Sequence, residues 1–228
     1  MTIADIVSSV YMKTKTNSTS FTAANMLIYI NNAYNRVVSL ILQADGRWQW
    51  DDDNQTDLPI ATTTVTSGQQ DYSISVSHLK VLRVELKGNG GTYFTKLEPI
   101  DIADREYIVD NTTTGVPEYY DIQGGSVFLY PIPNYTQAAS LKIYFQRGPA
   151  EFTSGEVTTG TKKPGFNSLY HDLIPLWVAY NYAIDNGLPS AAGFLSEIQR
   201  KEAEIPIDYG KRNKDDKDRF TPSPIAFK

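Results

Sequence analysis

The hydrophobic period of the sequence changes twice along the chain, and this change limits the folds open to it. In residues 21–45 apolar side chains recur at steps of three and four, as on one face of an α-helix. From about residue 56 to 147 the period falls to two and turn residues are frequent, which is typical of short β-strands. Helical spacing returns over 168–186 and 189–205. This order predicts an α+β fold in which N- and C-terminal helices form a bundle and a β domain is inserted between them.

Two helices are expected in the N-terminal part. Residues 2–13 predict a short helix, and residues 21–45 a longer one whose apolar face comprises Leu27, Ile30, Tyr34, Val37, Ile41 and Ala44. Ser20 or Thr22 is expected to cap the longer helix. Gly46 is expected to end it, because a Cβ atom disfavours the left-handed conformation common at helix ends.

Two tryptophans, Trp48 and Trp50, follow this helix. In an extended segment alternate side chains point to the same side, so both rings are expected to lie together. We interpret them as packing residues between the helix and the β domain, because aromatic side chains dominate cores. A ligand platform is the alternative.

Seven short strands are expected in the β domain, and they predict an antiparallel sandwich or a small barrel. Gly88–Gly91 and Gln123–Gly125 supply residues that tolerate positive φ in hairpin turns. Residues 100–109 predict a helical turn or two. The strands are expected at 60–66, 70–75, 80–86, 93–97, 118–122, 127–130 and 140–146.

The C-terminal part predicts two further helices and a terminal arm. Pro175 should bend the first helix or delay its start, and Gly187 should close it. Periodicity stops beyond Pro206. The expected division is a helical body from 1–55 and 168–206, an inserted β domain over 56–150, a connecting loop over 151–167 and an extended arm over 207–228.

Composition excludes several classes of function. The chain has no cysteine, so disulfides, thiol nucleophiles and zinc-finger or iron–sulfur sites are excluded, and synthesis in the cytoplasm is the default expectation. The most apolar window, residues 173–184, is too short to span a bilayer, and the first ten residues do not resemble a secretory signal. A net charge of −5 argues against a protein that grips nucleic acid by its phosphates.

The arm differs chemically from the rest of the chain. Residues 207–228 carry six basic and four acidic side chains, a net +2, which leaves −7 for the body. Phe220, Ile225 and Phe227 are spaced among Pro222 and Pro224, as in an extended segment that docks into a groove on a partner. The alternative is a frayed terminus.

No motif for catalysis or metal binding is complete. The segment 155–162 resembles a phosphate-binding loop, but a threonine stands where lysine must follow the second glycine. Residues 51–62 have threonine at the turn position and at the twelfth position of a calcium loop. His171 near Ser168 is a weak candidate general base, and the serine is better explained as a helix cap. We therefore predict no catalytic residue, no metal and no cofactor, and a protein that is not an enzyme.

Several segments together are similar to the head-to-tail adaptor proteins of tailed bacteriophages. Ser67–Ile74 resembles their first hairpin, and Thr114–Tyr120 with Gly124–Pro133 resembles the strands that follow. Ile143–Pro149 resembles their last strand, and His171–Pro175 the opening of their C-terminal helical pair. The segments occur in the family's order and cover most of residues 20–205.

This resemblance implies a structural virion protein at the neck between head and tail. It implies a homo-oligomeric ring, dodecameric like the portal, that docks beneath the portal, meets tail or tail-completion proteins, and lets genomic DNA pass without sequence-specific binding. The arm would reach onto the portal. We expect its apolar residues and prolines to anchor and its basic residues to steer, a set comprising Lys211, Arg212, Lys214, Phe220, Pro222, Pro224, Ile225 and Phe227.

Three alternatives remain open from the sequence. A tail-completion or tube-capping protein would also form rings but would bind the tail first. A virion-associated peptidoglycan hydrolase would turn over cell-wall substrate. A free sugar-binding β module would use the chain's many aromatic residues, although the flanking helices disfavour it.

Overall fold

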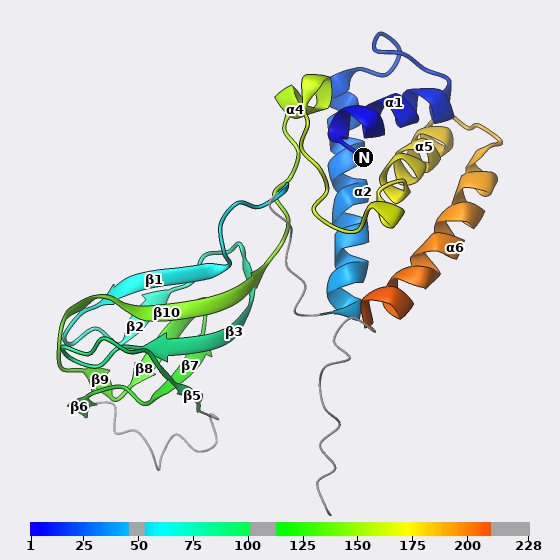
Figure 1. The fold of residues 1–228 in the computed structure, drawn as a ribbon. Coiled ribbons are helices and arrows are strands. Elements are labelled where there is room, and N and C mark those ends of the chain that lie inside the picture. The colour runs from blue at the N-terminus through cyan, green and yellow to red at the C-terminus, as the bar shows by residue number, and fades with distance from the viewer. Residues whose placement is uncertain (46–52, 101–112, 211–228) are drawn as a thin grey trace, which may run out of the picture. The chain divides into compact units, whose positions relative to one another are not determined.

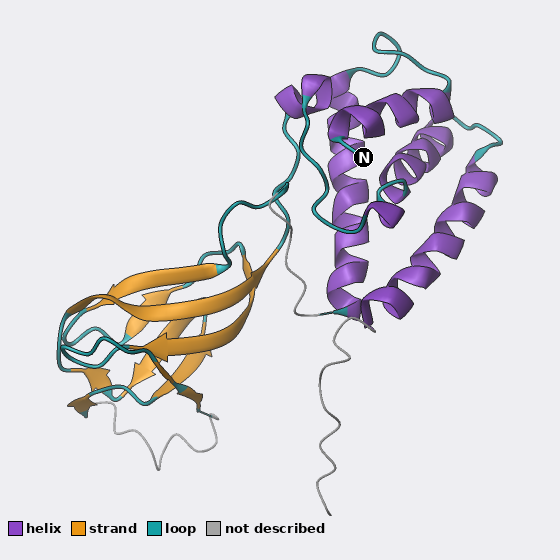
Figure 2. Cartoon of the chain, in the orientation of Figure 1, coloured by secondary structure: helices purple, strands orange, loops and turns teal. Residues whose placement is uncertain are grey.

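The protein is described by a computed structural model that covers residues 1–45, 53–100 and 113–210. The chain divides into two compact units. Met1–Trp48 and Glu151–Lys228 form a helical unit, and Gln49–Ala150 form a β unit. Figure 2 shows this separation of helices from strands. The α+β class and the placement of helices on both sides of the strands in the sequence confirm the predicted fold class.

The described helices of the helical unit include four of substantial length (Figure 1). A short helix, α4, and a single 3-10 turn, η2, lie between the N- and C-terminal pairs. α2 contacts α4, α5 and α6, while α1 contacts α4 and α5. The bounds are α1 Ile3–Thr14, α2 Ala23–Ala44, α4 Ser154–Thr159, η2 Ser168–Tyr170, α5 Leu173–Asp185 and α6 Ala191–Gly210.

The N-terminal helices begin at polar caps. Thr2 and Asp5 form a reciprocal capping box at α1. Of the two predicted caps for α2, the structure uses Thr22, whose hydroxyl accepts from the backbone of Asn25. α2 ends at Ala44 with Asp45 as its C-cap, and the predicted stop, Gly46, lies outside the described residues.

α5 is the most deeply buried helix of this unit. Seven of its 13 residues are buried, and a helix that is apolar on most sides belongs in the interior. Pro175 occupies the first turn, where its missing N–H costs no helical hydrogen bond, so the predicted late start is confirmed. The helix ends at Asp185, and Gly187, two residues further on, has φ 63°. Gly187 and Leu188 donate to the carbonyls of Ile184 and Ala183 in a Schellman motif.

Two expectations for the helical unit were wrong. The segment 151–167, predicted as a loop, contains α4, which starts at a Thr153–Glu156 capping box. The helical body does not end at 206, because α6 continues through Pro206 to Gly210. Burial of Ile205 and Tyr209 on the packed side of α6 outweighs the unfavourable effect of an interior proline.

In its described residues, 53–100 and 113–150, the β unit is a sandwich of two four-stranded sheets and a short two-stranded ribbon. One sheet, called sheet A, has the order β1-β10-β3-β4, and the other, sheet B, has the order β2-β8-β7-β5, while β6 pairs with β9. The bounds are β1 Ile60–Val65, β2 Asp71–Ser73, β3 His78–Leu86, β4 Thr95–Lys96, β5 Glu98–Pro99, β6 Thr114–Gly115, β7 Tyr119–Gln123, β8 Ser126–Tyr130, β9 Ile132–Pro133 and β10 Gln137–Arg147.

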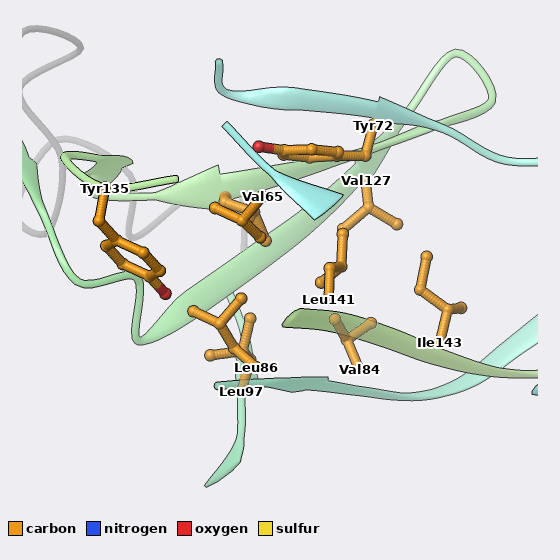
Figure 3. Close-up of a cluster of buried hydrophobic side chains, with 10 residues drawn as sticks. Val65, Tyr72, Val84, Leu86, Leu97, Val127, Tyr135, Leu141 and Ile143 are labelled. Atoms are coloured by element: carbon orange, nitrogen blue, oxygen red, sulfur yellow. The ribbon is translucent and has the colours of Figure 1, made fainter. Parts of the chain in front are cut away.

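The core of the sandwich lies between the two sheets (Figure 3). Val84 and Leu141 of sheet A and Tyr72 and Val127 of sheet B belong to one buried cluster. Two facing sheets with alternate residues turned inward are the arrangement expected of a β-sandwich. The predicted sandwich is therefore confirmed.

All seven predicted strands occur, with shifted ends, and the structure adds the two-residue strands β5, β6 and β9. All three added strands pair in parallel, β5 with β7 and β6 with β9, so the domain is not antiparallel throughout. The predicted turn between β7 and β8 is a two-residue hairpin in which Gly124 and Gly125 both have positive φ. The predicted helical turn at 100–109 falls almost wholly outside the described residues.

A bulge in β3 determines which side chains face outward. The pairing with β10 runs from Tyr144↔Arg83 directly to Phe145↔Val81, so Leu82 is the extra residue. Leu82 is 40% exposed. Because of this extra residue, Arg83 and Lys80 point to the same side of the sheet.

Candidate docking surfaces

The predicted docking and packing residues lie outside the described part of the chain. They are Trp48, Trp50, Lys211, Arg212, Lys214, Phe220, Pro222, Pro224, Ile225 and Phe227. The structure does describe the base from which residues 211–228 continue, namely the last turns of α6. This base is built from contacts that join distant parts of the sequence.

The last turn of α6 is fastened to the 3-10 turn η2. The Tyr170 hydroxyl donates to a carboxylate oxygen of Asp208 at 2.5 Å, and the Tyr209 hydroxyl accepts from the backbone N–H of Asn167 at 3.1 Å. The two tyrosine rings are 6.0 Å apart, and both residues are buried. Burial and, next, the hydrogen bond to Asp208 raise the pKa of the Tyr170 hydroxyl, so it remains a donor at neutral pH. We call Asn167, Tyr170, Asp208 and Tyr209 the arm root.

Polar contacts fix α6 further from its end as well. Lys201 donates to Asp172 at 2.6 Å, and the Trp177 indole donates to Glu202 at 2.9 Å. Arg36 of α2 also contacts Glu202, at 3.4 Å. These contacts and the arm root hold α6 along its second half, up to its end at Gly210.

Sequence reasoning missed the arm root. Tyr170 and Asp208 are 38 residues apart, and neither belongs to a local motif. The one available signal was the continuing helical spacing of Ile205 and Tyr209, four residues apart across Pro206. The proline concealed this signal, because it normally ends a helix.

A pocket opens at the other end of the helical unit. Its volume is about 290 Å³, and Ala179, Ala183, Leu188 and Phe194 provide apolar walls. Lys13 and Lys15, at the end of α1, also line it.

The two histidines have structural surroundings. The ring nitrogens of His171 lie 2.8 Å from the Met1 amine and 2.8 Å from the Phe166 carbonyl, so those two contacts, and not Ser168, engage its nitrogens. His78 stacks on Phe145 with centroids 3.5 Å apart. Burial, and then the nearby Arg147, lower the pKa of His78.

The incomplete motifs acquire no catalytic geometry in the structure. Residues 154–159 of the phosphate-loop-like segment form α4 instead of a loop. The described ranges contain no cluster of three or more His, Asp or Glu side chains suited to a metal. In those same ranges no helix combines the length and the apolarity that crossing a membrane requires.

Comparison with known families assigns the chain to a class of phage structural proteins, the adaptors. Within that class, it belongs to the SU10 adaptor protein family, whose model matches residues 1–225. No curated protein matches the chain. The match covers both units and most of the segment 211–228, so it describes nearly the whole molecule. The resemblance to phage adaptors inferred from the motifs is thereby confirmed at the level of the family.

Proposed function

We propose that this protein is the head-to-tail adaptor of a tailed phage, a ring beneath the portal that joins capsid to tail in the virion. The observation that carries the proposal is the family match over residues 1–225. The ring is homo-oligomeric and dodecameric, so that it matches the portal. Tail or tail-completion proteins bind on the side away from the portal. Genomic DNA passes through the lumen without sequence-specific binding.

The arm root supports a docking role for residues 211–228. A segment that docks on a partner loses less entropy when its base is already fixed, because fewer residues must be ordered on binding. Tyr170 and Tyr209 provide such a base. We propose that Phe220, Ile225 and Phe227 then anchor the arm on the portal.

The charge of the chain supports the passage of DNA. The body outside residues 207–228 carries −7, and negative charge facing a lumen repels phosphates and prevents adhesion during ejection. The basic residues Lys211, Arg212 and Lys214 are concentrated in the arm, where they steer it toward the portal.

Electron microscopy of the purified protein with and without purified portal tests the proposal. We expect dodecameric rings seated on the portal. Replacing Phe220, Ile225 and Phe227 together by alanine should abolish docking, because apolar anchors provide most of the binding energy at such contacts. A matched control replaces three exposed apolar residues of the β unit, Leu58, Val76 and Leu79, by alanine and should dock normally.

Two outcomes would contradict the proposal. A protein that binds tail-tube components but never the portal would be a tail-completion or tube-capping protein. Turnover of peptidoglycan by the purified chain would instead indicate a hydrolase. Normal docking of the triple alanine variant would remove the role of the arm and leave the ring assignment intact.

A further inference from the structure

The charged residues of the β unit are divided between its two sheets. All described lysines and arginines of this unit lie in β3, β4 and β10 of sheet A or directly after β3. They are Lys80, Arg83, Lys87, Lys96, Lys142 and Arg147. The strands of sheet B contain no lysine or arginine. Sheet A is therefore the basic side of the sandwich.

Strand register places four of these cations on the outer face of sheet A. Lys142, Glu85 and Lys96 are directly paired across β10, β3 and β4, so their side chains lie on one side. Val84, the neighbour of Glu85, is buried in the core, which identifies that side as the outer one. Arg83 and, through the bulge, Lys80 point to the same side.

Glu85 lies at the centre of this face and is only 6% exposed. Its carboxylate contacts Arg83 at 2.6 Å and Lys142 at 3.9 Å, and it accepts from the Tyr144 hydroxyl at 3.1 Å. Lys87 and Lys142 lie over the Phe94 ring, at 4.5 and 3.7 Å from its centroid. We define the cationic face as Lys80, Arg83, Lys87, Lys96 and Lys142 around Glu85, five positive charges against one negative.

The outer face of sheet B has the opposite charge. Asp71, Phe128 and Asp121 are directly paired across β2, β8 and β7. They point outward, because the adjacent pair Tyr72 and Val127 is in the core. Glu98 points outward for the same reason, since its neighbour Leu97 is buried. We define the acidic face as Asp71, Glu98 and Asp121.

Both faces carry charges that the sandwich itself does not neutralise. Within the described residues Lys80 and Lys96 have no carboxylate partner, and Asp71 and Glu98 have no cationic partner. All four residues are exposed. The two outer faces of one module are thus complementary in charge and open to solvent.

We infer that the cationic face of one copy docks on the acidic face of the next copy. This inference rests on the proposed ring, and it names the surfaces through which neighbouring copies meet. A contact between two different faces of the same subunit is heterologous, and such contacts generate closed rings when the rotation between copies is right. Complementary charge fixes the orientation of the docking and disfavours face-to-face dimers of like charge.

A second copy explains the surface better than DNA does. DNA would use the cationic face alone, and the acidic face would repel it. The net charge of −5 also disfavours binding to phosphates. A partner that also carries one cationic and one acidic face, such as a second copy of this chain, can use both faces of the sandwich.

Charge reversal tests the inference in the full-length chain. One variant carries Lys80→Glu and Lys96→Glu, which cancels the net positive charge of its cationic face. The other carries Asp71→Lys and Glu98→Lys, so both of its faces are basic. We expect each variant alone to need a roughly 100-fold higher concentration for ring assembly, because the attraction between the faces is lost in the first variant and like charges meet in the second. An equimolar mixture should assemble again, with the two variants alternating around the ring.

Mass photometry and electron microscopy, with and without portal, measure the assembly. The matched control reverses Lys13 and Lys15 of the helical unit, which changes the net charge equally and should leave ring formation unchanged. Circular dichroism of each variant establishes that it is folded. A misfolded variant is replaced by one with glutamine or asparagine at the same positions, for which a smaller loss of assembly is expected.

The outcomes separate this inference from the proposed function. Rings that form equally well with either reversed variant alone overturn the docking of the two faces and leave the adaptor function standing. An unaltered chain that forms no ring with portal overturns both. Rings that persist while binding of a short DNA duplex is lost only in the Lys80→Glu, Lys96→Glu variant assign the cationic face to DNA and overturn the inference.

Discussion

Tyr170 donates a hydrogen bond of 2.5 Å to Asp208, and this contact joins the turn before α5 to the last turn of α6. The tyrosine is 3% exposed, whereas the aspartate lies on the exposed side of the helix end. Together with the Tyr209–Asn167 hydrogen bond, it holds α6 four residues past the proline that the sequence predicts as the end of the body.

Replacing Tyr170 by phenylalanine should destabilise the helical unit by about 2 kcal/mol. The ring packing is retained, but a hydrogen bond to a charged acceptor is lost, and such bonds contribute about 1.5–3 kcal/mol. Calorimetry should show a fall in Tm of a few degrees. Tyr93→Phe is the matched control, because Tyr93 is 86% exposed, and its Tm should not change. An unchanged Tm for Tyr170→Phe would show that the contact does not hold α6 in place.

The stability of the protein should fall at alkaline pH in a manner that depends on Tyr170. Its pKa is raised in the folded state by burial and by Asp208, so the folded chain retains a proton that the unfolded chain releases near pH 10. The stabilisation is complete below that pH and is lost as the pH rises through it toward the folded pKa. Chemical denaturation between pH 8 and 11 should show this fall, with a smaller slope in Tyr170→Phe.

Replacing Pro206 by alanine should stabilise α6. Pro206 is exposed within the helix, so it contributes little packing while it removes one backbone donor and strains the preceding turn. We expect a gain of about 1–3 kcal/mol in the free energy of unfolding. Denaturant titration measures it. Pro175→Ala serves as the comparison and should give no such gain, because a proline in the first turn of α5 breaks no helical bond.

Acid should destabilise the β unit through His78. Burial, followed by the positive charge of Arg147, lowers the pKa of this imidazole, which stacks on Phe145. The folded state therefore favours neutral His78, and the stabilisation present above the unfolded pKa of about 6.5 is lost as the pH falls. His78→Phe keeps an aromatic ring and should reduce the loss of stability between pH 8 and 5. An identical pH dependence in the variant and the parent would exclude His78 as the source.

Local signals were sufficient to predict much of the fold. The capping side chain of Thr22 and the Gly124–Gly125 hairpin act through neighbouring residues, so their patterns lie in a few adjacent positions. α4 had such a signal as well, in the Thr153–Glu156 capping box, but Gly155 and the β-branched Val157 lower its helix propensity. The capping box therefore marks the start of a helix in a segment that was predicted as a loop.

Features that depend on distant contacts were not predictable from the sequence. The arm root joins residues 167–170 to residues 208–209, and no spacing rule relates those positions. The parallel pairs β5–β7 and β6–β9 involve two residues on each strand, too few for a periodic pattern. The docking residues proposed for the arm could be named from composition and order, and they stay a prediction.

The extra residue at Leu82 carries a consequence for sequence variation in β3. Lys80 and Arg83 are three positions apart, so simple alternation would put them on opposite sides of the sheet, and the bulge at Leu82 brings them together. Many side chains are therefore acceptable at position 82, because the residue there only needs to supply the extra, unpaired backbone unit of the bulge. Deleting this residue would remove the bulge and leave Val81 paired with Phe145 and Lys80 paired with Gln146, so both side chains would keep their present sides of the sheet. The shared side of Lys80 and Arg83 therefore depends on position 82 being unpaired, and the identity of the side chain there matters little.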